Sequence, residues 1–294
     1  MLKSSIILCS FLILSNIGYA KWDGQLVSPQ DQRLHSLQDS VRGIQAGQVI
    51  IMGETHDYLP DHNNQILFLQ QLAKASNAPI SVGMEFFEYP TQSIVDSYLQ
   101  GKLNDPDFLK QVGWGGNDYS QYRSQVLFPA SHGGATFALN LPRAISGRIA
   151  AVGVENLSAA EAALLPPNFA IGRKSYEERF AQLMADSHQI LSATDLEHYF
   201  AAQSSWDDTM AWRIAESMQK NPGQILFVIV GKFHVQYGGG LPDRLRARGV
   251  QHVLTITQYD AASGNESDLK NEIQLDAKYG AISDLVWIQG EPQP

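Results

Sequence analysis

Six short apolar runs rich in β-branched residues recur along the chain, and polar segments with helical spacing lie between most of them. A short apolar run bounded by turn residues is typical of a strand buried on both faces of a parallel sheet. Strands that alternate with helices predict an α/β fold with a mainly parallel central sheet flanked by helices. The predicted strands are Val49–Met52, Ile80–Met84, Ala135–Leu139, Ile149–Val152, Ile225–Val230 and Val253–Ile256.

Two spacers between these strands are too long for simple crossovers and carry helical patterns of their own. They predict helical insertions at about 88–130 and 158–220, which form a helical cap or small lobe beside the sheet. Three places in the second spacer fit a capping box, in which a Ser or Thr and a Glu three residues later bond each other's backbone N–H groups. These pairs are Ser158 with Glu161, Ser175 with Glu178 and Thr194 with Glu197.

The first twenty residues are typical of a signal peptide. Lys3 precedes the apolar run Ile6–Leu14, and Gly18-Tyr19-Ala20 fits a small-residue cleavage pattern. The apolar run is about half of the ~20 residues that a membrane-spanning helix needs. We therefore expect an exported protein of the periplasm or cell envelope, with residues 21–294 forming a single α/β domain.

Charge and cysteine content narrow the expected partners. Without Lys3, 20 basic residues face 30 acidic ones, a balance of −10 that disfavours nucleic acid. The only cysteine, Cys9, lies inside the apolar run, so disulfides are excluded and a lipid anchor is disfavoured. The chain contains neither a G-x-S-x-G elbow nor a phosphate loop, which argues against a serine hydrolase or a P-loop ATPase.

Polar residues of kinds that bind ligands follow the predicted strands directly. The carboxyl ends of parallel strands meet at one edge of a sheet, where open α/β folds bind ligands, so we expect these side chains to converge. In strand order they are Glu54 with His56, Glu85, Asn140 with Arg143, Glu155 with Asn156, and Lys232 with His234.

The converging histidines and glutamates predict a metal site. Two imidazoles with one or two carboxylates hold zinc, manganese or iron and leave a position for water, which makes metal-dependent hydrolysis one hypothesis. The candidate metal ligands are His56, Glu85 and His234. The candidate catalytic residues are Glu54, Glu85 and Arg143.

Less specific interpretations of the same residues stay open. A histidine taken alone more often caps a helix or bonds a backbone carbonyl, although two G-x-x-H segments, each after a buried strand, favour a shared site. Glu85 is alternatively an ordinary strand-end acid paired with Arg143. His62 either orients a ligand or is a solvated residue at a helix start.

Tyrosines near the polar elements suggest a second kind of site, because a tyrosinate can ligate ferric haem. Tyrosines in such places more often pack and hydrogen-bond through their hydroxyl groups. His132, before Gly133-Gly134, has an intermediate setting, and Gln203 and Asp207 share part of a helical turn that would point toward the cleft. The tyrosines are Tyr58, Tyr119, Tyr122 and Tyr237.

An ordered set of short motifs spans roughly Val49 to Thr257, and in that order it resembles the ChaN-like haem-binding proteins. The motifs are Gly53-Glu54-Thr55-His56-Asp57 with His62, Gly83-Met84-Glu85-Phe86-Phe87, Asn140-Leu141-Pro142-Arg143, Ala202-Gln203 with Trp206-Asp207, and Gly231-Lys232-Phe233-His234 with Tyr237.

The resemblance implies a bacterial envelope protein of iron or haem acquisition that works with an outer-membrane haem receptor system. It also implies a homodimer that buries two haems between subunits, with a tyrosine on the iron and a histidine in the pocket. Tyr122 is the first choice for that tyrosine, Tyr237 the second, and His132 a further candidate cofactor-binding residue. Members are often lipoproteins, whereas Cys9 is badly placed for a lipid.

The wider superfamily leaves the hydrolase hypothesis in place. It includes Tiki-like metalloproteases and erythromycin-esterase-like hydrolases, whose paired histidines and glutamate correspond here to His56, Glu85 and His234, with Arg143 nearby. The sequence thus supports an exported haem-binding protein first and a metal-dependent hydrolase second. A scaffold without chemistry explains the convergence of polar residues least well.

Overall fold

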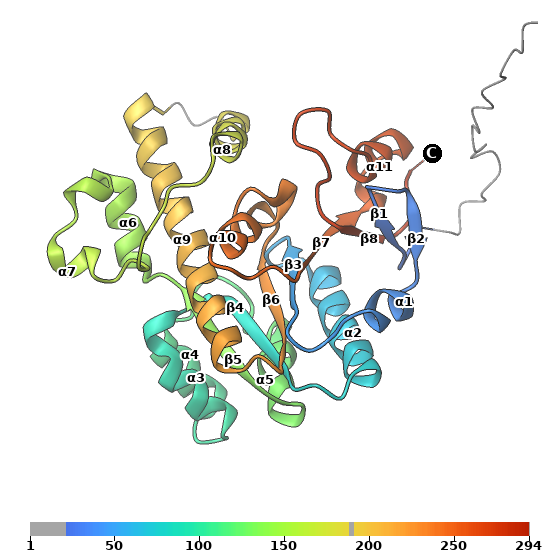
Figure 1. Cartoon of the computed structure of the whole chain (residues 1–294), viewed down its shortest axis with the longest axis horizontal. Helices are drawn as coiled ribbons and strands as arrows, with labels where there is room; N and C mark the ends of the chain where they lie inside the picture. Colours follow the sequence, from blue (N-terminus) through green and yellow to red (C-terminus); the bar gives the residue numbers. More distant parts are fainter. Residues whose placement is uncertain (1–21, 188–190, 294) are drawn as a thin grey trace, which may run out of the picture.

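The computed structural model of this protein describes residues 22–187 and 191–293. In that part of the chain eight strands form one sheet, in the order β2-β1-β8-β7-β3-β6-β4-β5 (Figure 1). The six strands from β8 to β5 run parallel, and β1 and β2 add antiparallel strands at one edge. The strands are β1 Leu26–Ser28, β2 Arg33–His35, β3 Val49–Glu54, β4 Ile80–Glu88, β5 Gly133–Asn140, β6 Ile225–Gly231, β7 Val253–Asp260 and β8 Leu285–Gln289.

Helices cover both faces of the sheet (Figure 1). No helix among the described residues is long and apolar enough to cross a membrane. The helices are α1 Leu37–Arg42, α2 Leu59–Ala75, α3 Gln92–Leu99, α4 Asp105–Val112, α5 Arg123–Leu127, α6 Arg143–Val152, α7 Ala159–Ala162, α8 Lys174–Asp186, α9 Ala193–Lys220, α10 Leu241–Ala247 and α11 Glu266–Ile273.

The side chains of the central strands point alternately to the two faces of the sheet, and this explains why helices cover both faces. Successive side chains of a strand point to opposite faces, so a strand whose residues are all apolar must bury both. In β3, Ile50 and Met52 pack with Phe68 of α2, whereas Val49 and Ile51 pack with α9 and α10 on the other face. All six β3 residues are buried. The sheet is therefore the middle layer of three.

Five of the six predicted strands are confirmed, and one is wrong. Residues Ile149–Val152 form the last turn of α6 instead. This run contains two alanines, which favour helix, and only Ile149 is buried. A four-residue apolar run carries too little periodicity to separate the two structures. Strands β1, β2 and β8 were not predicted.

One of the three capping boxes predicted in the second spacer is present, and two are wrong. The capping box of Ser158 with Glu161 is confirmed at α7. The pair Ser175 with Glu178 is wrong because α8 begins after Arg173, and Thr194 with Glu197 is wrong because Ser192 and Asp195 form that box two residues earlier. Thr194 lies inside the first turn of α9. A serine two residues away supplies the same cap.

Helices occupy both predicted insertions, but the predicted cap or lobe is not confirmed. In the first insertion, α3 and α5 contact β5 and β4 directly. In the second, α9 packs its buried face on the sheet through Met210 and Ile214. These helices belong to the layers that cover the sheet. The predicted signal peptide, residues 1–20, lies outside the described residues.

A side chain protects the open edge of β5. An edge strand presents backbone groups that no neighbouring strand can pair. The Gln92 amide of α3 supplies partners, because its Nε2 donates to the Thr136 carbonyl at 2.8 Å and its Oε1 accepts from the Ala138 N–H at 2.8 Å. One amide therefore stands in for a further strand.

Gln92→Ala removes both partners and should lower the free energy of unfolding by about 1–2 kcal/mol. Gln70→Ala, at an exposed position of α2, is the control and should change it by less than about 0.5 kcal/mol. Urea denaturation of the two variants measures the difference. Equal stabilities would show that the edge does not depend on Gln92.

Candidate functional site

The carboxyl ends of β3, β4 and β6 meet at one edge of the sheet, as predicted. Glu54, the last residue of β3, pairs in register with Gly231, the last residue of β6, and Met84 of β4 pairs with Ile229. Glu85 follows Met84 and lies within hydrogen-bond distance of the Gly231 N–H. Residues from three distant segments thus form a single cluster.

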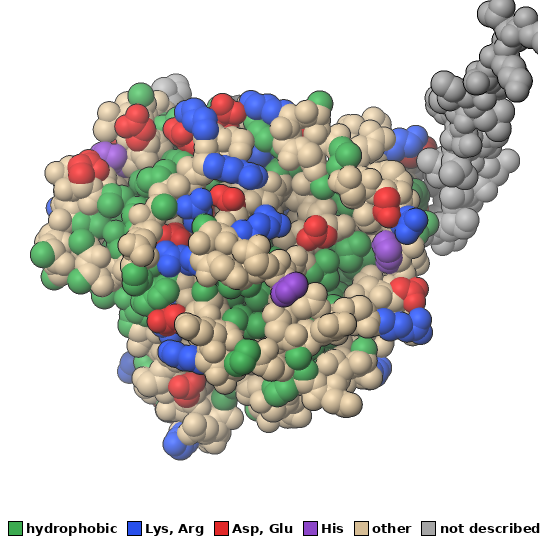
Figure 2. Space-filling model, in the orientation of Figure 1, with side chains coloured by type: hydrophobic (Ala, Val, Ile, Leu, Met, Phe, Trp, Pro, Cys, Tyr) green, Lys and Arg blue, Asp and Glu red, His purple; other side chains and the backbone are tan. Residues whose placement is uncertain are grey.

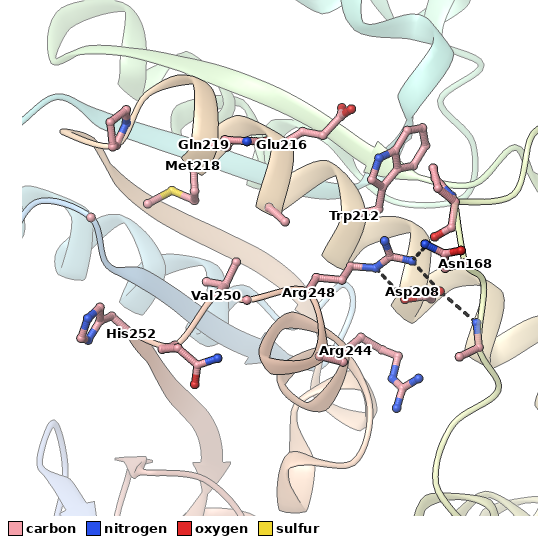
Figure 3. A pocket seen from close by; sticks show the side chains of 18 residues that line it. Asn168, Asp208, Trp212, Glu216, Met218, Gln219, Arg244, Arg248, Val250 and His252 are labelled. Atoms are coloured by element: carbon pink, nitrogen blue, oxygen red, sulfur yellow. Dashed lines mark hydrogen bonds and ion pairs between the residues drawn. The ribbon is translucent and has the colours of Figure 1, made fainter.

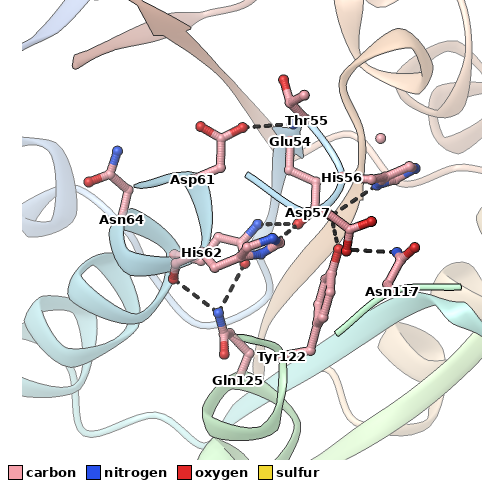
Figure 4. A network of polar contacts seen from close by, with 12 residues as sticks. Glu54, Thr55, His56, Asp57, Asp61, His62, Asn64, Asn117, Tyr122 and Gln125 are labelled. Carbon is pink, nitrogen blue, oxygen red and sulfur yellow. Dashed lines mark hydrogen bonds and ion pairs between the residues drawn. The ribbon is translucent and has the colours of Figure 1, made fainter. Parts of the chain in front are cut away.

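Glu54 is the centre of a buried hydrogen-bond network (Figure 4). Its Oε1 accepts from the Tyr122 hydroxyl at 2.7 Å and lies 3.0 Å from Nδ1 of His56, and its Oε2 accepts from Gln65 Nε2 at 2.5 Å. His62 Nδ1 lies 3.4 Å from Oε2. Burial opposes ionisation, but the hydrogen bond from His56 and the nearby His62 imidazole outweigh it and lower the pKa of Glu54. Glu54 is thus a carboxylate that orients His56.

The surroundings of His62 separate its two predicted roles, which were to orient a ligand or to lie solvated at a helix start. Its side chain is 1% exposed, so the solvated helix start is wrong. The imidazole packs edge-on against Tyr122, with ring centroids 4.3 Å apart, and contacts the same carboxylate as His56. His62 therefore supports the group that orients His56.

A second buried network surrounds His234. Its Nδ1 lies 2.7 Å from Oδ1 of Asp207 on α9, and its Nε2 lies 3.2 Å from Oε1 of Glu85. The other oxygens are also engaged, since Asp207 Oδ2 accepts from the Tyr176 hydroxyl at 2.9 Å and Glu85 Oε2 accepts from the Gly231 N–H at 2.6 Å. Asp207 shares a helical turn with Gln203, which also contacts His234. Gln203 and Asp207 therefore both reach the polar cluster at the strand ends, where they contact His234.

The charges in this second network follow from the contacts. Burial alone would lower the pKa of His234, but the carboxylates of Glu85 and Asp207 raise it well above its usual value. Burial likewise opposes ionisation of Glu85, yet His234 lowers the pKa of Glu85 to about 2. Both ring nitrogens of His234 lie within ion-pair distance of carboxylate oxygens, an arrangement that favours the doubly protonated ring.

This arrangement bears directly on the predicted metal ligands His56, Glu85 and His234. An imidazole binds a metal through a nitrogen lone pair, and both ring nitrogens of His234 face carboxylates in this network. No group of three or more His, Cys, Asp or Glu side chains in the described ranges is placed so as to hold a metal ion. His56 differs, because its Nδ1 faces Glu54 while 44% of its side chain is exposed.

Two motif glycines permit the close approach of β3 and β6. A Cβ atom on Gly53 would lie 2.9 Å from the Lys232 Cα, and one on Gly231 would lie 3.1 Å from the His56 ring. Gly53 therefore leaves space for the backbone of Lys232, and Gly231 leaves space for the ring of His56. The physical reason for the repeated glycine is this contact and not a special backbone conformation, because neither glycine has a positive φ.

Four predicted polar residues lie outside the cluster, and one of them, Asn156, donates to the Val152 carbonyl at 2.8 Å. Arg143 is exposed at the start of α6, where its guanidinium donates to the Gly113 carbonyl at 3.3 Å. Its predicted pairing with Glu85 is wrong, since Glu85 is bonded to His234. Glu155 follows a helix and is 69% exposed. His132 precedes β5, so it lies at the amino edge of the sheet, where it stacks on Phe128 at 3.9 Å.

The candidate tyrosines differ sharply in their surroundings. Tyr122 is fully buried and donates to Glu54, and burial together with that carboxylate raises its pKa. Tyr119 is also buried. The Tyr58 hydroxyl donates to Asp260 at 2.8 Å, and burial and then Asp260 raise its pKa to about 12. Tyr237 is half-buried, and the Arg179 guanidinium lies 4.3 Å from its ring centroid.

Tyr237 also adopts an unusual backbone conformation, with φ 58° and ψ 19°. A bulky residue in the left-handed region is rare and costs of order 1–3 kcal/mol, so the surrounding structure must hold it there. The strain falls in the turn η6, Gln236–Gly238, directly after the second G-x-x-H. A small cavity of about 290 Å³ opens next to this turn and is lined by Gln236, Lys232 and Thr55.

A larger cavity lies elsewhere. It has a volume of about 890 Å³ and extends between α9 and α10 to Gly47 and His252, at the amino ends of β3 and β7 (Figure 3). Its main charged groups neutralise each other, because Arg248 donates through Nε and a terminal nitrogen to both oxygens of Asp208, each at 2.8 Å. Arg248 also donates to the Pro167 carbonyl at 3.2 Å, so the ion pair fixes the loop that precedes α8. We therefore assign it a structural role.

Residues 41–245 match the sequence profile of the family described as "Haem-binding uptake, Tiki superfamily, ChaN". The chain belongs to this family. The resemblance noted from the ordered motifs is thereby confirmed. No curated protein matches the chain.

Among solved structures, this ChaN family member is similar to ChaN of Campylobacter jejuni, described as showing cofacial haem binding. The two share 16% identity over 89% of this chain and 95% of the other, with a TM-score of 0.66. The type III effector HopBA1 matches with 12% identity, 87% and 94% coverage and a TM-score of 0.47. The erythromycin esterase EreC matches with 12% identity, 82% and 78% coverage and a TM-score of 0.46. At these identities the ChaN match establishes the fold.

The site of this ChaN family member contains partners that the sequence analysis missed. These partners are Gln65 and Tyr176, which complete the two networks. Gln65 lies one turn after His62 on α2, so helical spacing from the motif would have found it. No local signal marks Tyr176, which reaches Asp207 from a different helix.

His234 should remain an imidazolium at pH 7.5. Because its folded-state pKa is raised above the usual 6.5, the stabilisation from its ion pairs is fully present below pH 6.5 and is lost as pH rises through the folded value. Nitrogen-15 NMR of the imidazole groups measures this, with His234→Gln identifying the signals. Two protonated ring nitrogens are expected, and a neutral tautomer at pH 7.5 would contradict the assignment.

Gly231→Ala should displace the His56 ring, because the added Cβ would lie 3.1 Å from its Cε1 and Nε2. The His56 Cε1–H resonance should shift, while far-ultraviolet circular dichroism stays near wild type. Gly223→Ala is the control, since a Cβ there meets no heavy atom within 4 Å. If both variants leave the His56 resonance in place, the contact between the two motifs is looser than described.

Proposed function

We propose that this protein binds haem at the carboxyl edge of its sheet, in iron or haem acquisition, through the phenolate of Tyr237. Family membership supports haem as the ligand. The observation that carries the choice of residue is the setting of Tyr237, a strained and half-buried tyrosine beneath the Arg179 guanidinium. A phenolate is a known protein ligand of ferric haem.

The electrostatics favour Tyr237 over the other tyrosines. An iron-bound tyrosine must lose its proton, and a nearby positive charge assists this. Burial raises the pKa of Tyr237, and the charge of Arg179 offsets only part of that rise. Tyr122 has the opposite environment, since the neighbouring Glu54 carboxylate adds to the effect of burial. This reverses the order of preference drawn from the sequence, in which Tyr122 came first.

The buried position of Tyr122 supports a different role for it. Its hydroxyl donates to the carboxylate that orients His56, and its ring packs with His62, Phe86 and Trp114. A haem iron would have to displace these contacts to reach the oxygen. His132 is likewise disfavoured as a haem residue, because it lies at the opposite edge of the sheet.

The proposal extends to location and assembly. The signal-peptide pattern in residues 1–20 supports export to the periplasm or cell envelope, with an outer-membrane haem receptor system as the partner. A homodimer is proposed because the similar ChaN of Campylobacter jejuni is described as binding haem cofacially, which needs two haem-binding faces together. We do not extend the proposal to metal-dependent hydrolysis, because both nitrogens of His234 are engaged.

Tyr237→Phe should abolish the high-spin tyrosinate spectrum of the haemin complex, because it deletes the oxygen and keeps the ring. Tyr122→Phe is the matched control and should leave that spectrum unchanged, while costing about 1 kcal/mol of stability through the lost bond to Glu54. Visible absorbance titrations with haemin measure both. If Tyr122→Phe removes the spectrum and Tyr237→Phe does not, the assignment of the ligand is wrong.

Haemin should raise the fraction of dimer if two subunits share the buried ligands. A ligand that binds only the associated state stabilises that state by mass action. Sedimentation velocity of the purified protein with and without stoichiometric haemin measures the shift. A monomer that binds haemin to saturation without changing its sedimentation coefficient would rule out the shared interface.

A further inference from the structure

Three arginines converge on the strained turn that carries Tyr237. Besides Arg179 above the ring, Arg173 donates from a terminal nitrogen to the Tyr237 carbonyl at 2.8 Å. The terminal nitrogen of Arg246, on α10, would lie 3.6 Å from a Cβ atom built on Gly238. The arginines come from α8, the segment before it and α10, so the fold brings them together.

The three arginines differ in how many donors they have left. Arg179 is occupied, because its two terminal nitrogens donate to the main-chain and side-chain oxygens of Gln236 at 3.0 and 2.9 Å. Arg173 is exposed and uses one terminal nitrogen on the Tyr237 carbonyl. Arg246 is exposed, and within the described part of the chain its guanidinium makes no hydrogen bond or ion pair. Arg173 and Arg246 therefore hold unused donors beside Tyr237.

The acidic side chains near these arginines are mostly neutralised by other partners. Ion pairs join Glu177 to Lys174 at 3.0 Å, Glu178 to Lys278 at 2.8 Å and Asp243 to Arg244 at 2.8 Å. Glu272 and Asp276 also raise the pKa of Tyr237 through their charge; burial raises the pKa of Glu272 and so opposes its ionisation, whereas the Tyr279 and Lys278 N–H groups lower the pKa of Asp276.

Basic side chains gather over α8 and α10 in the space-filling view, with acidic ones among them (Figure 2). This grouping contrasts with the whole chain, whose net charge is −9. Long-range attraction therefore does not bring an anion to this protein, and the local arrangement of arginines has to supply recognition. A guanidinium presents a fork of N–H groups that matches a carboxylate, which a lysine ammonium does not.

We propose that Arg173 and Arg246 bind the carboxylates of a porphyrin whose ring lies against Tyr237. This inference rests on the proposed haem site and names the residues that select an acidic porphyrin over a neutral one. It assigns different tasks to neighbouring groups: Tyr237 provides the oxygen for the iron, Arg179 favours the phenolate, and the two exposed arginines position the ring by its acid groups.

The test uses iron-free protoporphyrin IX and its dimethyl ester, which keeps the ring and removes both charges. Wild-type protein should bind the free acid about 10-fold or more tightly than the ester, because charge-assisted hydrogen bonds are lost in the ester. Arg246→Gln and Arg173→Gln should each weaken binding of the free acid about 10-fold and leave binding of the ester unchanged. Arg33→Gln, at a 76% exposed side chain of β2, is the control and should change neither.

Several outcomes would overturn the inference. Equal affinity of the wild type for acid and ester would show that carboxylates are not recognised, and so would the lack of saturable binding of either compound. Equal weakening of acid and ester binding by Arg246→Gln would indicate a structural role. Arg246 is the decisive position, because Arg173→Gln also removes a hydrogen bond to the turn.

The same experiment separates this inference from the proposed iron ligand. Protoporphyrin IX without iron does not need Tyr237 for ligation, so Tyr237→Phe should leave its binding intact. If the haemin spectrum survives in Tyr237→Phe while the arginine effects on the acid persist, the ligand assignment fails and the carboxylate contacts stand. If Tyr237→Phe abolishes the haemin spectrum but the arginine variants bind the free acid as wild type does, the ligand assignment stands and the carboxylate contacts fail.

Discussion

The carboxyl ends of β3 and β6 lie so close to each other's motifs that a Cβ atom on Gly53 would clash with the Lys232 backbone and one on Gly231 would press on the His56 ring. This contact places His56 against Gly231 and brings Glu85 to the Gly231 N–H. Buried carboxylates at the end of a sheet are costly unless they are hydrogen-bonded, and breaking one partner of a buried pair typically costs about 3–5 kcal/mol. The two networks around Glu54 and His234 satisfy that requirement.

The two networks differ in what they leave available. Around His234 both ring nitrogens face carboxylates, and these contacts join β4, the turn η5 (Lys232–His234) and α9. Around Glu54 the carboxylate is fully used, yet it holds His56 with much of its side chain exposed. The histidines of two similar motifs therefore have different roles, one internal and one at the surface. Tyr237, three residues after His234, is only half-buried.

The sequence predicted the parts of the fold in which composition and burial agree. Five apolar runs became parallel strands of a sheet whose two faces are both covered, and the polar residues after β3, β4 and β6 converge as expected. The run at Ile149–Val152 was wrongly predicted as a strand, because its two alanines are equally compatible with a helix. Strands β1 and β2 have three residues each, which is too short for any periodicity.

The candidate site was predictable in position and much less so in role. The protonation of His234 depends on Asp207 and Glu85, which approach from different elements, so the motif alone made it look like a metal ligand. The choice between Tyr122 and Tyr237 depends on burial and on Arg179, and neither can be read from neighbouring residues. A crystal structure of the haem complex tests the central claim most directly. The account predicts iron bound to the Tyr237 oxygen beside Arg179, and iron bound elsewhere, with that oxygen free, would contradict it.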